Sequence, residues 1–221
     1  MKTSHLINIL LAVALVVLSI RLVRDNPQPT ASTDADGATS ATVQSKDAEE
    51  AVKQNILTRT SIRAYTDKDV DEKSVEQLLR AAMAAPTAGN KQPWRFVVIR
   101  DNATLKKISE NFKSMAMAEH APVAIVVCGD TEATFPGEGV GYWIQDASAA
   151  TENLLLMAHS MGLGAVWCGI YPMSDRVKIL SEMLSLPANI IPLNVIPIGY
   201  PAEDPAPKDK WTPASVHYEK W

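Results

Sequence analysis

The chain has 221 residues, which is room for one domain of ordinary size or for one domain with an appendage. Hydrophobic residues make up 47% and charged residues 21%, values that exclude a wholly disordered or fibrous chain. With 21 Lys and Arg against 25 Asp and Glu, the formal net charge is −4, so no nucleic-acid partner is expected. The two cysteines and four histidines show no ligand spacing, and we expect neither a disulfide framework nor a metal site.

The chain opens with an apolar stretch, residues 6–23, whose only polar members are Asn8, Ser19 and Arg21. As a helix it would be about 27 Å long, close to the ~30 Å hydrocarbon thickness of a bilayer. A stretch that is apolar on all sides leaves two readings, an uncleaved anchor or a cleaved signal peptide. The run is long for a signal peptide and no A-x-A site follows it. Residues 1–24 are therefore predicted to be a membrane anchor or signal segment, with the anchor favoured.

The next segment, residues 25–48, is polar, and Val43 is its only large aliphatic residue up to Asp47. Such a segment cannot bury enough surface to offset its chain entropy, so we expect a disordered linker. The basic residues on either side of the apolar stretch hardly discriminate its orientation. The expected location is a single-pass anchor in a bacterial inner membrane, with a slight preference for a periplasmic domain.

Residues 49–221 alternate helix and strand signals and predict one α+β domain. Val75, Leu78, Leu79, Ala82 and Met83 follow the spacing of an amphipathic helix. Pro197 indicates that the last strand is an edge strand or carries a bulge. Helices are expected over 49–57, from a cap at Asp71, over 103–117, over 142–161 as the longest, and from a cap at Ser174; strands are expected over 96–99, 123–128 and 194–200.

Common nucleotide and hydrolase motifs do not account for this domain. The glycines of residues 137–141 lack a preceding strand and the right last spacing for a dinucleotide fingerprint, which indicates a loop. The sequence contains neither a P-loop nor a G-x-S-x-G elbow.

Four short segments carry more specific chemistry. Residues 59–63 place two guanidinium groups and two hydroxyls together, which suits a phosphate, although a solvated helix end is the alternative. Residues 85–94 combine small residues with amide side chains and permit the close approach of a flat ligand. Residues 162–169 form an apolar, glycine-spaced turn, and residues 208–211 supply a second pair of cations.

In this order and spacing, the segments resemble the FMN-dependent nitroreductase family over residues 49–221. The resemblance rests on TRTSIRAY, AAPTAGNKQPWRFVVI, YWIQDASAATENLLLMAHSMGLGAVWCG and GYPAEDPAPKDKW. It implies a three-layer sandwich, in which helices flank a mixed, mainly antiparallel sheet. It also implies an obligate homodimer with FMN at the subunit interface.

The resemblance assigns roles to individual residues. Arg59 is similar to the family's phosphate-binding arginine, with Lys208 and Lys210 as cationic companions. Arg63 would approach the pyrimidine edge and stabilise reduced flavin. The remaining predicted contacts are Thr60 and Ser61 at phosphate or ribityl oxygens; Pro86, Thr87, Ala88 and Asn90 from the partner subunit; and Trp167, Cys168 and Gly169 beside the ring, largely through backbone.

The implied activity is hydride transfer from NAD(P)H through FMN N5 to a small nitroaromatic, quinone or enone acceptor. The cofactor carries this chemistry, so no catalytic side-chain acid or base is expected. Two alternatives remain open: a related flavoenzyme of the dehalogenase or flavin-degrading type, and a non-catalytic flavin-binding module tethered to a membrane.

Overall fold

A computed structural model of the chain describes residues 35–221. The chain divides into two compact units, Met1–Ala48 and Glu49–Trp221, and each is considered by itself. The predicted anchor at residues 6–23 lies outside the described residues. Within the described part, no helix combines the length and the apolar character needed to cross a membrane.

Helix α2 (Ala35–Thr58) begins inside the segment expected to be a disordered linker. The prediction of disorder is therefore not upheld for residues 35–48. This stretch contains no proline and is rich in alanine, and both features permit a helix that gains little from burial. At 24 residues, α2 is also longer than the central helix that was expected to be the longest.

The sheet of the second unit has the strand order β1-β2-β5-β3, with β4 also paired to β5. Every pairing among the described residues is antiparallel, so the parallel pairing of a mixed sheet is absent from residues 35–221. The strands are β1 (Trp94–Ile99), β2 (Val123–Asp130), β3 (Gly164–Ala165), β4 (Cys168–Gly169) and β5 (Ile190–Gly199).

Strand β5 is central, which corrects the edge alternative drawn from Pro197; it does carry a bulge, at Leu193 and not at Pro197. It pairs with β2 along one side and with two short strands along the other. Pro197 lies opposite the gap between β3, which pairs at Ile198 and Gly199, and β4, which pairs at Asn194 and Val195. A residue without a backbone N–H is tolerated at such a gap because no ladder bond is lost there.

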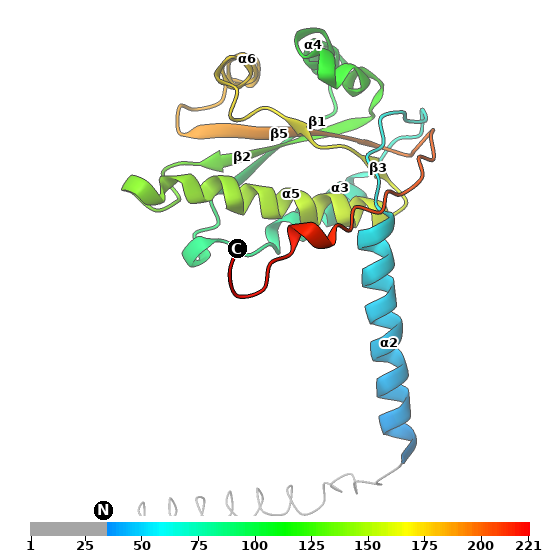
Figure 1. Cartoon of the computed structure of the whole chain (residues 1–221). Coiled ribbons are helices and arrows are strands. Elements are labelled where there is room, and N and C mark those ends of the chain that lie inside the picture. Colours follow the sequence, from blue (N-terminus) through cyan, green and yellow to red (C-terminus); the bar gives the residue numbers. More distant parts are fainter. Residues whose placement is uncertain (1–34) are drawn as a thin grey trace, which may run out of the picture. The chain divides into compact units, whose positions relative to one another are not determined.

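Helices cover both faces of the sheet and give the expected three layers (Figure 1). One face packs against α3 and α5, and the other packs against α4, α6 and the 3₁₀ segment Lys113–His120. Strand β2 is buried along its whole length because its alternate side chains enter the two cores. The helices are α3 (Glu72–Met83), α4 (Asn102–Asn111), α5 (Tyr142–Ser160) and α6 (Ser174–Leu184).

Local sequence explains several helix boundaries. The Asp71 carboxylate accepts a hydrogen bond from Ser74 N at 2.6 Å, as the predicted cap of α3 requires. The chain leaves α5 through Gly162. Its φ of +70° is in the left-handed region, which glycine adopts easily.

Three predicted features differ in the structure. Met173, not Ser174, precedes α6 as its cap residue, and it has no side-chain cap bond. Helix α4 ends at Asn111 because the chain tightens into 3₁₀ turns. Met83, predicted to lie on the apolar stripe of α3, is 51% exposed since the stripe runs out at the helix end.

Gly129 of β2 is required by the close packing of Trp143. A Cβ at this position would lie 2.1 Å from the Trp143 ring. We expect Gly129→Ala to lower the free energy of unfolding by about 1–3 kcal/mol through overpacking. Gly141→Ala is the control, since a Cβ there meets nothing within 4 Å and the φ of Gly141 is −63°. Denaturant unfolding of both variants checks this, and equal losses would contradict it.

Candidate functional site

Arg59 follows the end of α2 and lies against the C-terminal half of α5. Its Nε is 3.8 Å from Glu152 Oε1, and its side chain is only 18% exposed. Two further contacts hold this junction: Asn55 Nδ2 donates to Leu156 O at 3.0 Å, and Thr58 Oγ1 lies 2.9 Å from His159 Nε2. Arg59 is therefore presented by a fixed helix end and is not a freely solvated side chain.

The charge of Arg59 affects the pKa of His159. Burial lowers the pKa of His159, and the nearby Arg59 guanidinium lowers it further. Protonation of His159 is thus disfavoured by its burial and by the neighbouring Arg59 charge. An anion beside Arg59 would relieve that effect.

The segment after Arg59 runs beside the loop that follows α5. Ile62 N donates to Ala165 O at 3.1 Å, and Gly164 leaves room for the Ile62 side chain, since a Cβ there would lie 2.5 Å from it. Arg63 is exposed, and its backbone N–H, together with that of Ala64, donates to the Glu203 carboxylate. The 59–63 segment is therefore joined to β3 within one chain.

Strand β4 presents backbone more than side chain. Gly169 is exposed, and a Cβ on it would meet no atom within 4 Å. Trp167 is 37% exposed, whereas Cys168 is buried. Burial raises the pKa of the Cys168 thiol to about 11, against the opposing charges of Arg63 and Arg176. A thiol with this pKa is a poor nucleophile at neutral pH, so the open Gly169 backbone is the feature suited to a flat ligand.

The segment carrying Pro86, Thr87, Ala88 and Asn90 lies at the other half of α5. Ala88 N donates to Asp146 Oδ1 at 2.9 Å, while Asp146 Oδ2 is buried without a partner in the described residues. This segment includes the 3₁₀ turn Ala88–Asn90, and Gly89, Asn90 and Gln92 all have φ between +51° and +55°. Three left-handed residues in so short a stretch need support from outside it.

That support comes from the packing and polar contacts around the segment. The ring of Phe135 packs directly on Gly89, where a Cβ would lie 2.6 Å from it. Thr87 Oγ1 accepts a hydrogen bond from Gln92 N at 3.2 Å. Arg95 Nη1 donates to Gln92 O at 3.3 Å and to Trp94 O at 2.8 Å.

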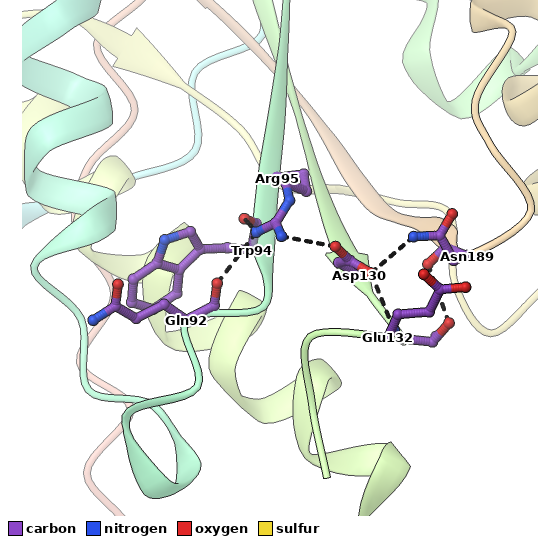
Figure 2. Close-up of polar contacts among 7 residues, drawn as sticks. Gln92, Trp94, Arg95, Asp130, Glu132 and Asn189 are labelled. Atoms are coloured by element: carbon purple, nitrogen blue, oxygen red, sulfur yellow. Dashed lines mark hydrogen bonds and ion pairs between the residues drawn. The ribbon is translucent and has the colours of Figure 1, made fainter. Parts of the chain in front are cut away.

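Arg95 is itself fixed by Asp130, as Figure 2 shows. Asp130 Oδ2 accepts from Arg95 Nη2 at 2.7 Å, and its Oδ1 accepts from Asn189 Nδ2 at 2.9 Å and Glu132 N at 3.0 Å. Burial alone would raise the pKa of Asp130, but these hydrogen bonds and the Arg95 charge outweigh it, and the pKa is lowered. The ionised carboxylate, at the end of β2, thus links the 86–92 segment to the start of β1 and to the residue before β5.

We expect Asp130→Asn to loosen this segment, because an amide cannot accept all three bonds and carries no charge for Arg95. The expected loss in unfolding free energy is about 1–3 kcal/mol, with faster amide exchange over residues 86–92. Asp69→Asn is the matched control at the opposite end of β1. Asp69 pairs with Arg100 at 3.1 Å but is 76% exposed, so its loss should cost about 0–1 kcal/mol. Unchanged exchange over residues 86–92 in Asp130→Asn would contradict the role of the pair.

The predicted site residues thus fall into three places. Arg59 contacts α5, and Thr60, Ser61 and Arg63 belong to the segment that is hydrogen-bonded to Ala165, which precedes Trp167, Cys168 and Gly169 in the chain. The 86–90 segment lies apart from them along α5. Lys208 and Lys210 are exposed on the tail after β5, and neither forms an ion pair with a described side chain.

Several polar residues of the site are not evident in the sequence patterns. Asp146 and Glu152 lie within an apolar helix, and Glu203 lies in a proline-rich tail. Arg176 donates to Gly169 O at 2.9 Å. The sequence does contain a signal for Arg176. A cation in the first turn of a helix is unfavourable because the helix dipole is positive there, so such a residue is unusual.

Comparison with known proteins agrees with this geometry. The model of the nitroreductase family matches residues 56–116 and 110–200. A Methanothermobacter thermautotrophicus protein named "Putative NADH dehydrogenase/NAD(P)H nitroreductase" is 46% identical over 170 residues, 77% of this chain and 87% of the relative. A Bacillus subtilis FMN reductase [NAD(P)H] is 29% identical over 182 residues, 76% of this chain and 72% of the relative. The solved FMN-dependent nitroreductase of Clostridium difficile has a TM-score of 0.67 and 29% identity, and the match covers 74% of this chain and 96% of that one.

The fold and the matches together define a flavin-dependent type of α+β reductase. The chain belongs to the nitroreductase family.

The predicted location is corrected by these findings. A single-pass anchor with a lean toward the periplasm was expected, with residues 6–23 in the membrane. No helix within residues 35–221 can cross a membrane, and the relatives are named as an NAD(P)H nitroreductase and an NAD(P)H-using FMN reductase.

The residues present fit a flavin nucleotide. Arg59 has an exposed carboxylate as its ion-pair partner, which a phosphate can replace. Gly169 offers open backbone of the kind a planar ring requires. Asp146 carries a buried oxygen without a partner in the described part of the chain, next to the segment predicted to line the ligand.

Proposed function

We propose that the chain is an FMN-dependent NAD(P)H:acceptor oxidoreductase whose acceptors are small nitroaromatics, quinones or enones. One observation carries this proposal most directly. The Ile62–Ala165 hydrogen bond joins the cationic 59–63 segment to β3, and β4, which carries the open backbone of Gly169, pairs with the same strand β5. We expect a phosphate group to meet the first feature and a flat ring to meet the second.

When bound, FMN supplies hydride acceptance and donation at N5. Arg59, aided by the hydroxyls of Thr60 and Ser61, holds the phosphate end. Arg63 places a positive charge at the pyrimidine edge, which favours the reduced state. Trp167, Cys168 and Gly169 orient the ring through their backbone, and the buried Cys168 thiol holds its proton at neutral pH.

The acceptor class is inferred from the surface around β4. Trp167 and Tyr171 are 37% and 36% exposed, and Tyr171 packs edge-on against Trp143 at 5.0 Å between ring centroids. Exposed aromatic faces favour a planar, apolar acceptor over a charged one. The short connection between β2 and α5 leaves little chain to cover this surface.

Loss of Arg59 should weaken FMN binding. The full chain, purified with FMN, is expected to be yellow and to bleach rapidly when NADH or NADPH is added without oxygen. Arg59→Ala removes a charge-assisted bond worth ~1.5–3 kcal/mol, so the FMN Kd should rise about 10–150-fold. Titration with FMN, followed by fluorescence, measures both proteins.

Lys106→Ala is the control for a lost surface cation. Lys106 lies on α4 with its side chain 65% exposed, and its removal should leave the FMN Kd unchanged. A full chain that takes up no FMN would sink the proposal. A chain that holds FMN but is not bleached by either nucleotide would favour the non-catalytic flavin-binding alternative.

The separated positions of the two halves of the site support a homodimer. Residues 86–90 would complete the FMN site of the partner, and Lys208 and Lys210 would approach its phosphate from an exposed tail. Several large apolar residues that a second copy could cover are exposed: Val52, Ile56 and Leu57 on α2, and Trp211, Tyr218 and Trp221 on the tail.

We expect light scattering to give twice the 24.0 kDa chain mass, with an interface above ~1,600 Å². Ile56→Asp should shift the equilibrium toward monomer by placing a charge on the apolar side of α2. Lys106→Asp, on the exposed face of α4, should not. A monomer that binds FMN at full affinity would rule out a site shared between two chains.

A further inference from the structure

Arg176 has a contact that the proposed cofactor site does not use. It is the third residue of α6, and its Nη1 donates to Gly169 O at 2.9 Å. The first turn of a helix disfavours a positive charge because the helix dipole is positive there. The position of Arg176 is therefore electrostatically unfavourable within α6. Its hydrogen bond to Gly169 of β4 offsets that cost.

Gly169 is held on both sides of its peptide. It pairs with Asn194 of β5, and Arg176 binds its carbonyl, while the space above its Cα is open. A carbonyl bound by a guanidinium cannot rotate toward that open space without losing a charge-assisted hydrogen bond. The open face of β4 is thus pre-organised by a side chain from α6.

Arg176 also adds charge at this place. The guanidinium groups of Arg63 and Arg176 both act on Cys168, although they come from segments more than one hundred residues apart. The Glu203 carboxylate accepts hydrogen bonds from the backbone N–H groups of Arg63 and Ala64, and Asp175 precedes Arg176 in the first turn of α6. Two cations therefore converge on the strand that the proposed function assigns to the flavin ring.

We propose that Arg176 is a positioning residue that fixes the Gly169 peptide against the flavin and, with Arg63, favours reduced over oxidised FMN. This inference rests on the proposed function. Uptake of a hydride from NAD(P)H adds two electrons and one proton to FMN and releases NAD(P)⁺. The reduced cofactor thus gains one negative charge, and a nearby cation stabilises it more than it stabilises the oxidised form.

The experiment compares the FMN Kd of the full chain in the oxidised and the dithionite-reduced state. In Arg176→Gln, the ratio of oxidised to reduced Kd should fall on the order of tenfold, the effect of one screened unit charge in a partly buried site. Arg176→Lys should retain most of the ratio because it keeps the charge. Lys178→Gln, two residues along α6 and exposed, should leave the ratio unchanged.

The outcomes separate the two proposals. If wild-type chain binds FMN but Arg176→Gln changes both Kd values equally, Arg176 is only structural and this inference is wrong. If wild-type chain binds no FMN in either state, the proposed function itself fails, and this inference with it. A loss of folding in Arg176→Gln would show in thermal unfolding. The comparison would then use Arg176→Lys and the charge-neutral Arg176→Met. An equal ratio of oxidised to reduced Kd in these two variants would overturn the inference.

Discussion

The arrangement of this domain depends on the way the central strand β5 is paired: continuously on one side and with a gap on the other. On one side β5 pairs continuously with the fully buried β2 apart from one bulge, which fixes it in the core. On its other side it holds β3 and β4 as two separate two-residue strands with Pro197 opposite the gap. Residues 166–167 therefore leave the sheet between two anchored points. This constraint exposes Trp167 and Gly169 while Cys168 remains buried.

Local patterns predicted the parts of the fold that depend on neighbouring residues. The Asp71 cap, the buried stripe of α3 and strand β2 follow from short-range hydrogen bonding and side-chain periodicity. The edge alternative drawn from Pro197 was wrong because the number of partners of β5 depends on strand pairing, which is a long-range property. Helix α2 was missed over residues 35–48 because low hydrophobicity indicates that a segment gains little by burial, which does not forbid a helix.

The candidate site shows the same division. The segments around Arg59, Asn90 and Gly169 were predicted because each concentrates one kind of chemistry in a few residues. The brace formed by Arg95, Asp130 and Asn189 joins residues up to 94 positions apart, and none of them is unusual in its local sequence. Its function is to support a backbone with several left-handed residues, and only the φ values of residues 89–92 reveal that need.

The electrostatics of the Arg59 junction indicate how such a site can be stable before its ligand binds. Arg59 is mostly buried, so an unpaired guanidinium there would be costly. Glu152 offsets that charge, but at 3.8 Å and with 53% exposure it forms only a weak ion pair, of about 0–1 kcal/mol. A phosphate with two or more charged oxygens forms stronger charge-assisted bonds than this carboxylate. On the proposed function, a phosphate would therefore compete favourably with Glu152 for Arg59.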